Sequence, residues 1–197
     1  MNKTVSKCLR IIGGVLVALL LILAGYLYWK WPIYPSSEKK LESISELREA
    51  LVECEATKDC IVLDPAEYGT NSESFTLKLS DRFRNADPCG YYIFGTYPES
   101  DRKKSLSITS LPIDDFLRLE VAESVYRDAQ TKLTKGSYPS QERYVNLELL
   151  CGEYYYLVSA SFKTTGLPEQ ELAERDADLQ ALVYSVADRI IDAAEAP

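Results

Sequence analysis

The fold is decided by residues 145–162, which read VNLELLCGEYYYLVSASF. Apolar residues fill every second position of residues 145–151 and again of residues 156–162, which is the two-residue period of a half-buried strand. Between the two runs, Gly152-Glu153 is a Gly-X pair of the kind that forms a two-residue type II′ turn. The stretch therefore predicts an antiparallel β-hairpin.

Four shorter apolar stretches precede this hairpin and predict further strands. In three of them, apolar and polar residues alternate or β-branched and aromatic residues are frequent. The first is instead a continuous apolar run, CIVL, which ends at Asp64-Pro65. They lie at residues 60–63, 75–79, 91–97 and 105–109.

Three segments have the spacing of amphipathic helices. The first runs from residue 38 to about residue 56, after an N-cap at Ser36 or Ser37. The second begins after Asp114, with apolar residues four apart, and ends at Gly136. The third follows Pro168. Its buried face is expected at Leu172, Leu179, Val183, Val186 and Ile190.

Strands separated by long helices predict one α+β domain over residues 38–197, a mostly antiparallel sheet with helices packed against it. The most informative elements are the strands at 75–79 and 106–108, the helix from about Asp115, the strand 156–160 and the helix 179–191. Their order over about residues 73–193 resembles the Mog1/PsbP-like domains, which include DcrB-type bacterial envelope proteins. The resemblance implies a binding or accessory protein and brings no catalytic residues with it.

The N-terminal part predicts a membrane anchor. Residues 11–28 carry no charge, and a helix needs roughly 20 apolar residues to cross a bilayer. Lys3, Lys7 and Arg10 precede this run, so the positive-inside rule places residues 1–10 in the cytoplasm. We expect an uncleaved, single-pass signal-anchor in the cytoplasmic membrane, a linker at 29–37, and a domain in the periplasm or extracellular space. A signal peptide cleaved after Ala24 is the alternative.

Net charge separates the same two parts of the chain. Residues 1–30 contain four basic residues and no acid, so the remaining residues hold 18 basic and 30 acidic residues, a net charge of −12. Such a domain repels phosphate backbones, and nucleic acid is therefore not an expected partner. A basic protein partner fits better, although acidity also promotes solubility.

Four of the five cysteines fall in the predicted exported domain, where disulfides are stable. These are Cys54, Cys60, Cys89 and Cys151. Among the three possible pairings, Cys54–Cys60 with Cys89–Cys151 is preferred, because the second bond would close a long loop and restrict the unfolded chain. Free thiols are the alternative if the domain is cytosolic.

The chain contains no histidine. This excludes Ser-His-Asp and Cys-His nucleophile systems and any zinc or haem held by histidine. Asp114-Asp115 is explained by helix capping, and Asp59, Asp64 and Glu67 read as a hydrated acidic loop rather than a cation site. Phosphate-binding glycine loops and serine-nucleophile motifs are absent from the sequence. We therefore expect no catalytic residue, no cofactor and no metal.

Tyrosine is frequent, with 14 in the chain. Three consecutive tyrosines in one strand occupy both faces of a sheet, and tyrosine combines a large contact area with a polar tip, which suits protein interfaces. The candidate interface residues are Tyr91, Tyr92, Tyr97, Tyr154, Tyr155 and Tyr156. Cross-strand packing inside the domain is the other interpretation.

Together these observations predict a membrane-anchored, non-catalytic protein-binding domain. A periplasmic immunity protein that neutralises a secreted toxin is one concrete form, and an envelope assembly or secretion accessory factor is another. A carrier of lipid or another small ligand would need an apolar cavity. A hydrolase that uses carboxylates alone would need two acids about 5–9.5 Å apart in a cleft.

Overall fold

The computed structural model describes residues 3–30, 39–79, 90–98, 103–113, 121 and 124–196. The chain divides into two compact units. The helix α1 (Lys3–Lys30) belongs to the first unit, and every strand and every other helix described belongs to the second.

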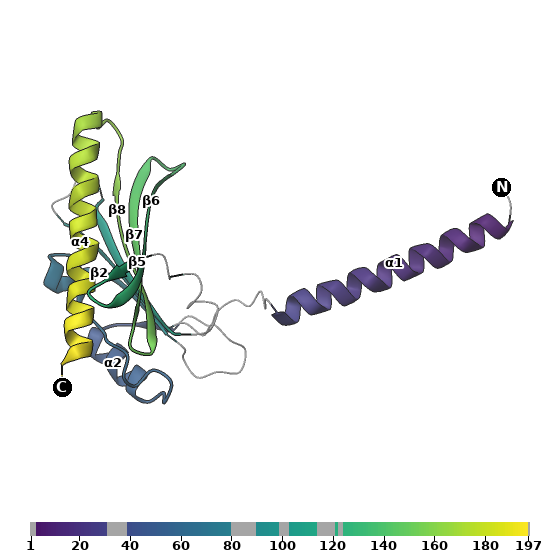
Figure 1. Ribbon diagram of the computed structural model, residues 1–197, viewed down its shortest axis with the longest axis horizontal. Helices are drawn as coiled ribbons and strands as arrows, with labels where there is room; N and C mark the ends of the chain where they lie inside the picture. Colours follow the sequence, from purple (N-terminus) through teal and green to yellow (C-terminus); the bar gives the residue numbers. More distant parts are fainter. Residues whose placement is uncertain are drawn as a thin grey trace. The chain divides into compact units, whose positions relative to one another are not determined.

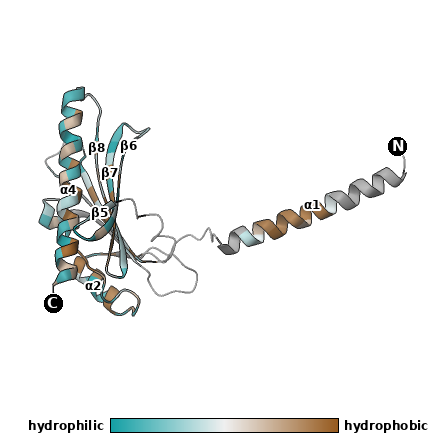
Figure 2. Cartoon of the chain, in the orientation of Figure 1, coloured by the Kyte–Doolittle hydropathy of each residue, from teal (hydrophilic) through white to brown (hydrophobic). Residues whose placement is uncertain are grey.

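The side chains of α1 are described for residues 13–26. Most of them are large and apolar, and all are exposed. Figure 2 shows this apolar section. Within the described residues, no helix is long and apolar enough to cross a membrane. The predicted anchor, residues 11–28, is therefore not confirmed.

The second unit is an α+β domain built on an eight-stranded sheet in which every strand pair is antiparallel, as predicted (Figure 1). The strand order across the sheet is β1-β2-β3-β4-β8-β7-β6-β5. The strands are β1 (Lys39–Leu41), β2 (Asn71–Leu79), β3 (Tyr91–Thr96), β4 (Ser105–Pro112), β5 (Ser124–Tyr126), β6 (Ala129–Tyr138), β7 (Glu142–Cys151) and β8 (Tyr154–Lys163).

The hairpin from which the fold was predicted is confirmed as β7 and β8. Its register pairs Cys151 with Tyr154 at the turn and Glu142 with Lys163 at the open end. Gly152 has a φ of 60°, a value that the first position of a type II′ turn requires and that glycine adopts without strain.

The last predicted helix is also confirmed, as α4 (Glu169–Glu195). It packs on β7 and β8 and covers one face of the sheet (Figure 1). Of its predicted buried residues, Leu172 is half-buried and the rest are buried. The core between helix and sheet is filled by side chains such as Leu147, Val158 and Val183, each fully buried.

The helix predicted between Asp114 and Gly136 is wrong from residue 124 onward, where the chain forms β5 and β6. Apolar residues four apart satisfy a two-residue period as well as a helical one, so Ala129 and Leu133 share one face of a strand. Arg127 and Asp128 have φ values of 48° and 68°, and this left-handed pair turns the chain between the strands. Residues 114–120, including Asp114-Asp115, lie outside the described residues.

The first predicted helix is shorter than expected. The helix α2 spans Ile44–Val52, and its N-cap is Ser43, whose hydroxyl accepts a hydrogen bond from the Glu46 nitrogen at 3.1 Å. Part of the predicted helix is instead β1, and the proposed caps at Ser36 and Ser37 lie outside the described residues. A short 3₁₀ helix, η1 (Pro65–Tyr68), follows later in the chain.

Candidate functional site

Residues 60–63 were predicted to form a strand, and this prediction is wrong: they form an irregular segment beside the sheet. A packed segment of this kind still needs partners for its backbone polar groups. At Ile61, the hydroxyls of two core tyrosines are these partners. Its nitrogen donates to the Tyr156 hydroxyl at 3.1 Å, and its carbonyl oxygen accepts from the Tyr91 hydroxyl at 2.6 Å.

Other side chains fix the rest of this segment. Arg48 of α2 donates from Nη2 to the Val62 carbonyl oxygen at 3.1 Å. The Cys60 thiol lies 3.1 Å from the Ser110 hydroxyl of β4. One turn earlier, Tyr154 donates from its hydroxyl to the Ala56 carbonyl oxygen at 3.2 Å. Residues 56–62 are thus held against the end of the sheet largely by side chains.

These contacts favour the other interpretation of the tyrosines, packing inside the domain, for four of the six candidates. Tyr91, Tyr154, Tyr155 and Tyr156 are all buried within the domain, so most of their surface packs its interior. Tyr155 lies on the other face of the sheet, where it packs with Val121. The two remaining candidates, Tyr92 and Tyr97, are half-buried.

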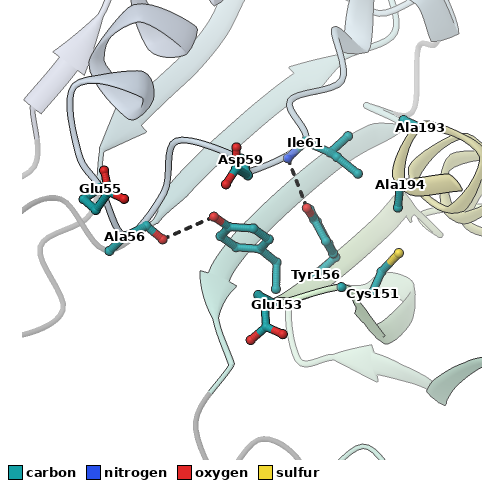
Figure 3. Close-up of a pocket in the computed structure, with 11 residues that line it drawn as sticks. Glu55, Ala56, Asp59, Ile61, Cys151, Glu153, Tyr156, Ala193 and Ala194 are labelled. Carbon is teal, nitrogen blue, oxygen red and sulfur yellow. Dashed lines mark hydrogen bonds between the residues drawn. The ribbon is translucent and has the colours of Figure 1, made fainter. Parts of the chain in front are cut away.

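A pocket of about 430 Å³ opens between this segment, the β7–β8 turn and the end of α4 (Figure 3). Tyr154 and Tyr156 form part of its wall while their hydroxyls reach the segment backbone. Its charged side chains are the carboxylates Glu55, Asp59 and Glu153. The other lining residues are Ala56, Ile61, Cys151, Gly152, Ala193 and Ala194.

The pocket has a negative electrostatic character. None of its lining residues is basic, and Ala193 and Ala194 belong to the last turn of α4, where the helix dipole places partial negative charge. One carboxylate is partly compensated, because Lys58 lies 2.5 Å from Glu55. The site can therefore accept a cation or a hydrogen-bond donor, and it would repel an anion.

The acidic loop considered at Asp59, Asp64 and Glu67 does not gather in the structure. Asp64 caps η1 by accepting from the Ala66 nitrogen at 2.8 Å, and Glu67 forms an ion pair with Arg189 of α4. In the described part of the chain, no three His, Cys, Asp or Glu side chains lie close enough to hold a metal ion.

The structure does not form the predicted Cys54–Cys60 disulfide: neither cysteine, nor Cys151, takes part in a disulfide bond. Cys89, the predicted partner of Cys151, lies outside the described residues. Burial raises the pKa of the Cys60 thiol to about 11, against hydrogen bonds from Ser110 and Tyr156 that lower it. Burial and then the nearby Glu195 carboxylate raise the pKa of Cys151.

Sequence reasoning missed this pocket because its walls come from three separate parts of the chain. The alternating pattern of β8 predicted where Tyr154 and Tyr156 lie, but nothing local indicates that their hydroxyls hold residues 56–61.

No protein-family model, curated protein or solved structure matches this chain. The Mog1/PsbP-like resemblance therefore stays a prediction, and the function must be argued from the site.

Proposed function

We propose that this chain is a membrane-anchored, non-catalytic binding protein whose domain receives a basic side chain of a protein partner in the acidic pocket. The charge of the pocket carries the proposal: Glu55, Asp59 and Glu153 line a space of about 430 Å³, and none of the lining residues is basic. A partner lysine or arginine would form charge-assisted hydrogen bonds there.

The chemistry of the pocket supports binding rather than catalysis. The reactive form of cysteine is the thiolate, and the raised pKa values of Cys60 and Cys151 keep both thiols protonated at neutral pH. The chain has no histidine to act as a base for them. A carrier function is less well supported, because closely packed side chains fill the space beneath α4.

The anchor in this proposal is the uncharged stretch 11–28 of α1, which extends beyond residues 13–26, the part whose side chains the structure describes. Its described section presents large apolar side chains over its whole circumference, among them Leu16, Leu20 and Leu23, each more than half exposed. Basic residues precede this section and no acidic residue occurs in the first 30 residues. We propose that α1 lies in the cytoplasmic membrane and that the domain faces the periplasm or extracellular space.

A binding experiment with a basic peptide tests the pocket. The full-length chain in detergent micelles would be titrated with a hexa-arginine peptide, with hexaglutamate as the negative control. We expect Asp59→Asn and Glu153→Gln each to weaken hexa-arginine binding by roughly tenfold, since each removes a charge-assisted contact.

Glu174→Gln is the matched control. It removes the same charge from an exposed position of α4, about 30 Å along the helix from Ala194 at 1.5 Å per residue. If this variant weakens binding as much as the pocket variants, the attraction is diffuse and the pocket is not the site.

A periplasmic immunity protein is the concrete form that we favour, because a domain tethered at the outer face of the membrane would meet an arriving toxin. Deletion of the gene should then sensitise cells to a toxin encoded next to it, and the pocket variants should protect less well than Glu174→Gln. Unchanged survival, together with a defect in envelope assembly or secretion, would favour the accessory-factor alternative.

A further inference from the structure

The sheet has a second hollow on the face that α4 leaves uncovered. Val158, Ala160 and Phe162 of β8 point into the core, so the alternate residues Ser159 and Ser161 lie on the opposite face. A trough of about 420 Å³ lies there, at the end of β8 away from the acidic pocket.

Serines form the floor of this trough. In the register of β4 and β8, Ser105 lies opposite Ser161, and Ser107 lies opposite Ser159. Larger side chains flank this square of four: Phe94 faces Ser107 from β3, and Tyr138 stands on the other side, stacked on Tyr144 with ring centroids 4.5 Å apart. Short side chains between aromatic ones are what hollow the surface.

A hydrogen-bond chain organises the floor. Ser161 donates to the Glu142 carboxylate at 2.5 Å, so the Ser105–Ser161 bond at 2.8 Å must have Ser105 as its donor. Ser159 likewise donates to the Asn146 side-chain oxygen at 2.6 Å. These serine protons are therefore committed, and the oxygens of Ser105 and Ser159 remain as acceptors for a ligand hydroxyl.

The rim of the trough carries positive charge. Lys103 and Lys163 line it, both are exposed, and neither has an ion-pair partner among the described residues. Lys163 lies opposite Glu142 in the register, but the Glu142 carboxylate accepts its hydrogen bond from Ser161. Two ammonium groups are thus available to an anionic group on the ligand.

We propose that this trough binds an acidic saccharide chain, one whose sugar rings carry carboxylate groups. Sugar hydroxyls would donate to the serine oxygens, the apolar faces of the rings would lie against Phe94 and Tyr138, and the carboxylates would meet Lys103 and Lys163. A peptide fits less well. Extended peptides commonly pair with a free sheet edge, whereas β4 and β8 are central strands paired on both sides.

Calorimetric titration of the full-length chain in detergent micelles tests this proposal. The ligands are trigalacturonate, its neutral methyl ester and a hexaglutamate peptide. We expect trigalacturonate to bind, the methyl ester to bind more weakly, and hexaglutamate not to bind. Lys103→Ala and Lys163→Ala should each weaken trigalacturonate roughly tenfold without changing the affinity for the ester.

Two further variants separate the trough from the rest of the surface. Ser107→Phe fills the floor and should abolish saccharide binding while hexa-arginine binding at the acidic pocket is retained, which shows that the domain is folded. Lys132→Ala removes a lysine from β6, outside the residues that line the trough, and should change nothing.

Three results would overturn the proposal. They are no binding of either saccharide at about 10 mM, which excludes even millimolar affinity; binding that survives in Ser107→Phe; and binding of hexaglutamate as tight as that of trigalacturonate, which would make the site a peptide site. Failure of hexa-arginine to bind would count only against the acidic pocket.

Discussion

Tyr156→Phe is the substitution that tests most directly how the wall of the acidic pocket is built. The Tyr156 side chain is fully buried, and its hydroxyl accepts from the Ile61 nitrogen at 3.1 Å and lies 3.9 Å from the Cys60 sulfur. Phenylalanine keeps the ring and leaves no large cavity, so the change isolates the hydroxyl. We expect a loss of about 1–3 kcal/mol in the free energy of unfolding, because the Ile61 nitrogen loses its acceptor.

The same reasoning applies to the hydrogen bond that the Ile61 carbonyl oxygen accepts. Tyr91→Phe removes the hydroxyl that donates to the Ile61 carbonyl oxygen at 2.6 Å, and it should destabilise the domain by about 1–2 kcal/mol. Because both hydrogen bonds hold one residue, we expect the double variant to lose at least about 0.5 kcal/mol less than the sum of the single variants.

Urea unfolding followed by near-ultraviolet circular dichroism measures these changes, since it reports the tyrosine environment rather than the helix content of α1. Tyr138→Phe is the control. Its side chain is 47% exposed, and it should stay within about 0.5 kcal/mol of the wild type. The reasoning is refuted if Tyr156→Phe unfolds at the same urea concentration as Tyr138→Phe.

Three other predictions concern separate parts of the domain. Because the folded state holds the Cys60 proton up to a pKa of about 11, against a usual value of 9.0, the free energy of unfolding should fall as pH rises from 9 to 11. Urea titrations at both pH values should show a smaller fall in Cys60→Ala. Gly136→Ala should cost about 1 kcal/mol, because the new Cβ would lie 2.5 Å from the Tyr144 hydroxyl oxygen; an unchanged urea midpoint would contradict this. Ser43→Ala should cost about 1 kcal/mol through loss of the α2 cap, whereas Ser43→Gly, measured in the same way, should cost less.

The parts of the fold that could be predicted are those whose structure is specified locally. The β7–β8 hairpin needs only alternation and a glycine in the turn, and α4 needs only its apolar stripe. The segment from residue 124 to residue 138 was mispredicted because the spacing of four residues fits a strand and a helix equally well. The left-handed conformations of Arg127 and Asp128, which decide between the two, leave no clear mark in the sequence.

The candidate pocket could not be predicted, since its walls meet only after folding. A continuous apolar run at residues 60–63 has the composition of a strand, yet its backbone partners are tyrosine hydroxyls and an arginine. An apolar run therefore indicates burial more reliably than it indicates a ladder of backbone hydrogen bonds. The serine floor of the trough could be predicted in part, because the alternation of residues along β8 places Ser159 and Ser161 together on its outer face.

Tyrosine hydroxyls replace a strand ladder as the hydrogen-bond partners of this segment. Tyrosine is one of the few side chains that fills a core and still donates or accepts a hydrogen bond at its far end. Tyr91, Tyr154 and Tyr156 each use that far end on the backbone of residues 56–61. The sheet therefore sets the position of the segment that follows Glu55 and carries Asp59, and the shape of the pocket depends on tyrosine hydroxyls as well as on its charged residues. Loss of a buried hydroxyl should consequently weaken hexa-arginine binding as well as stability, without removing a single charge from the pocket.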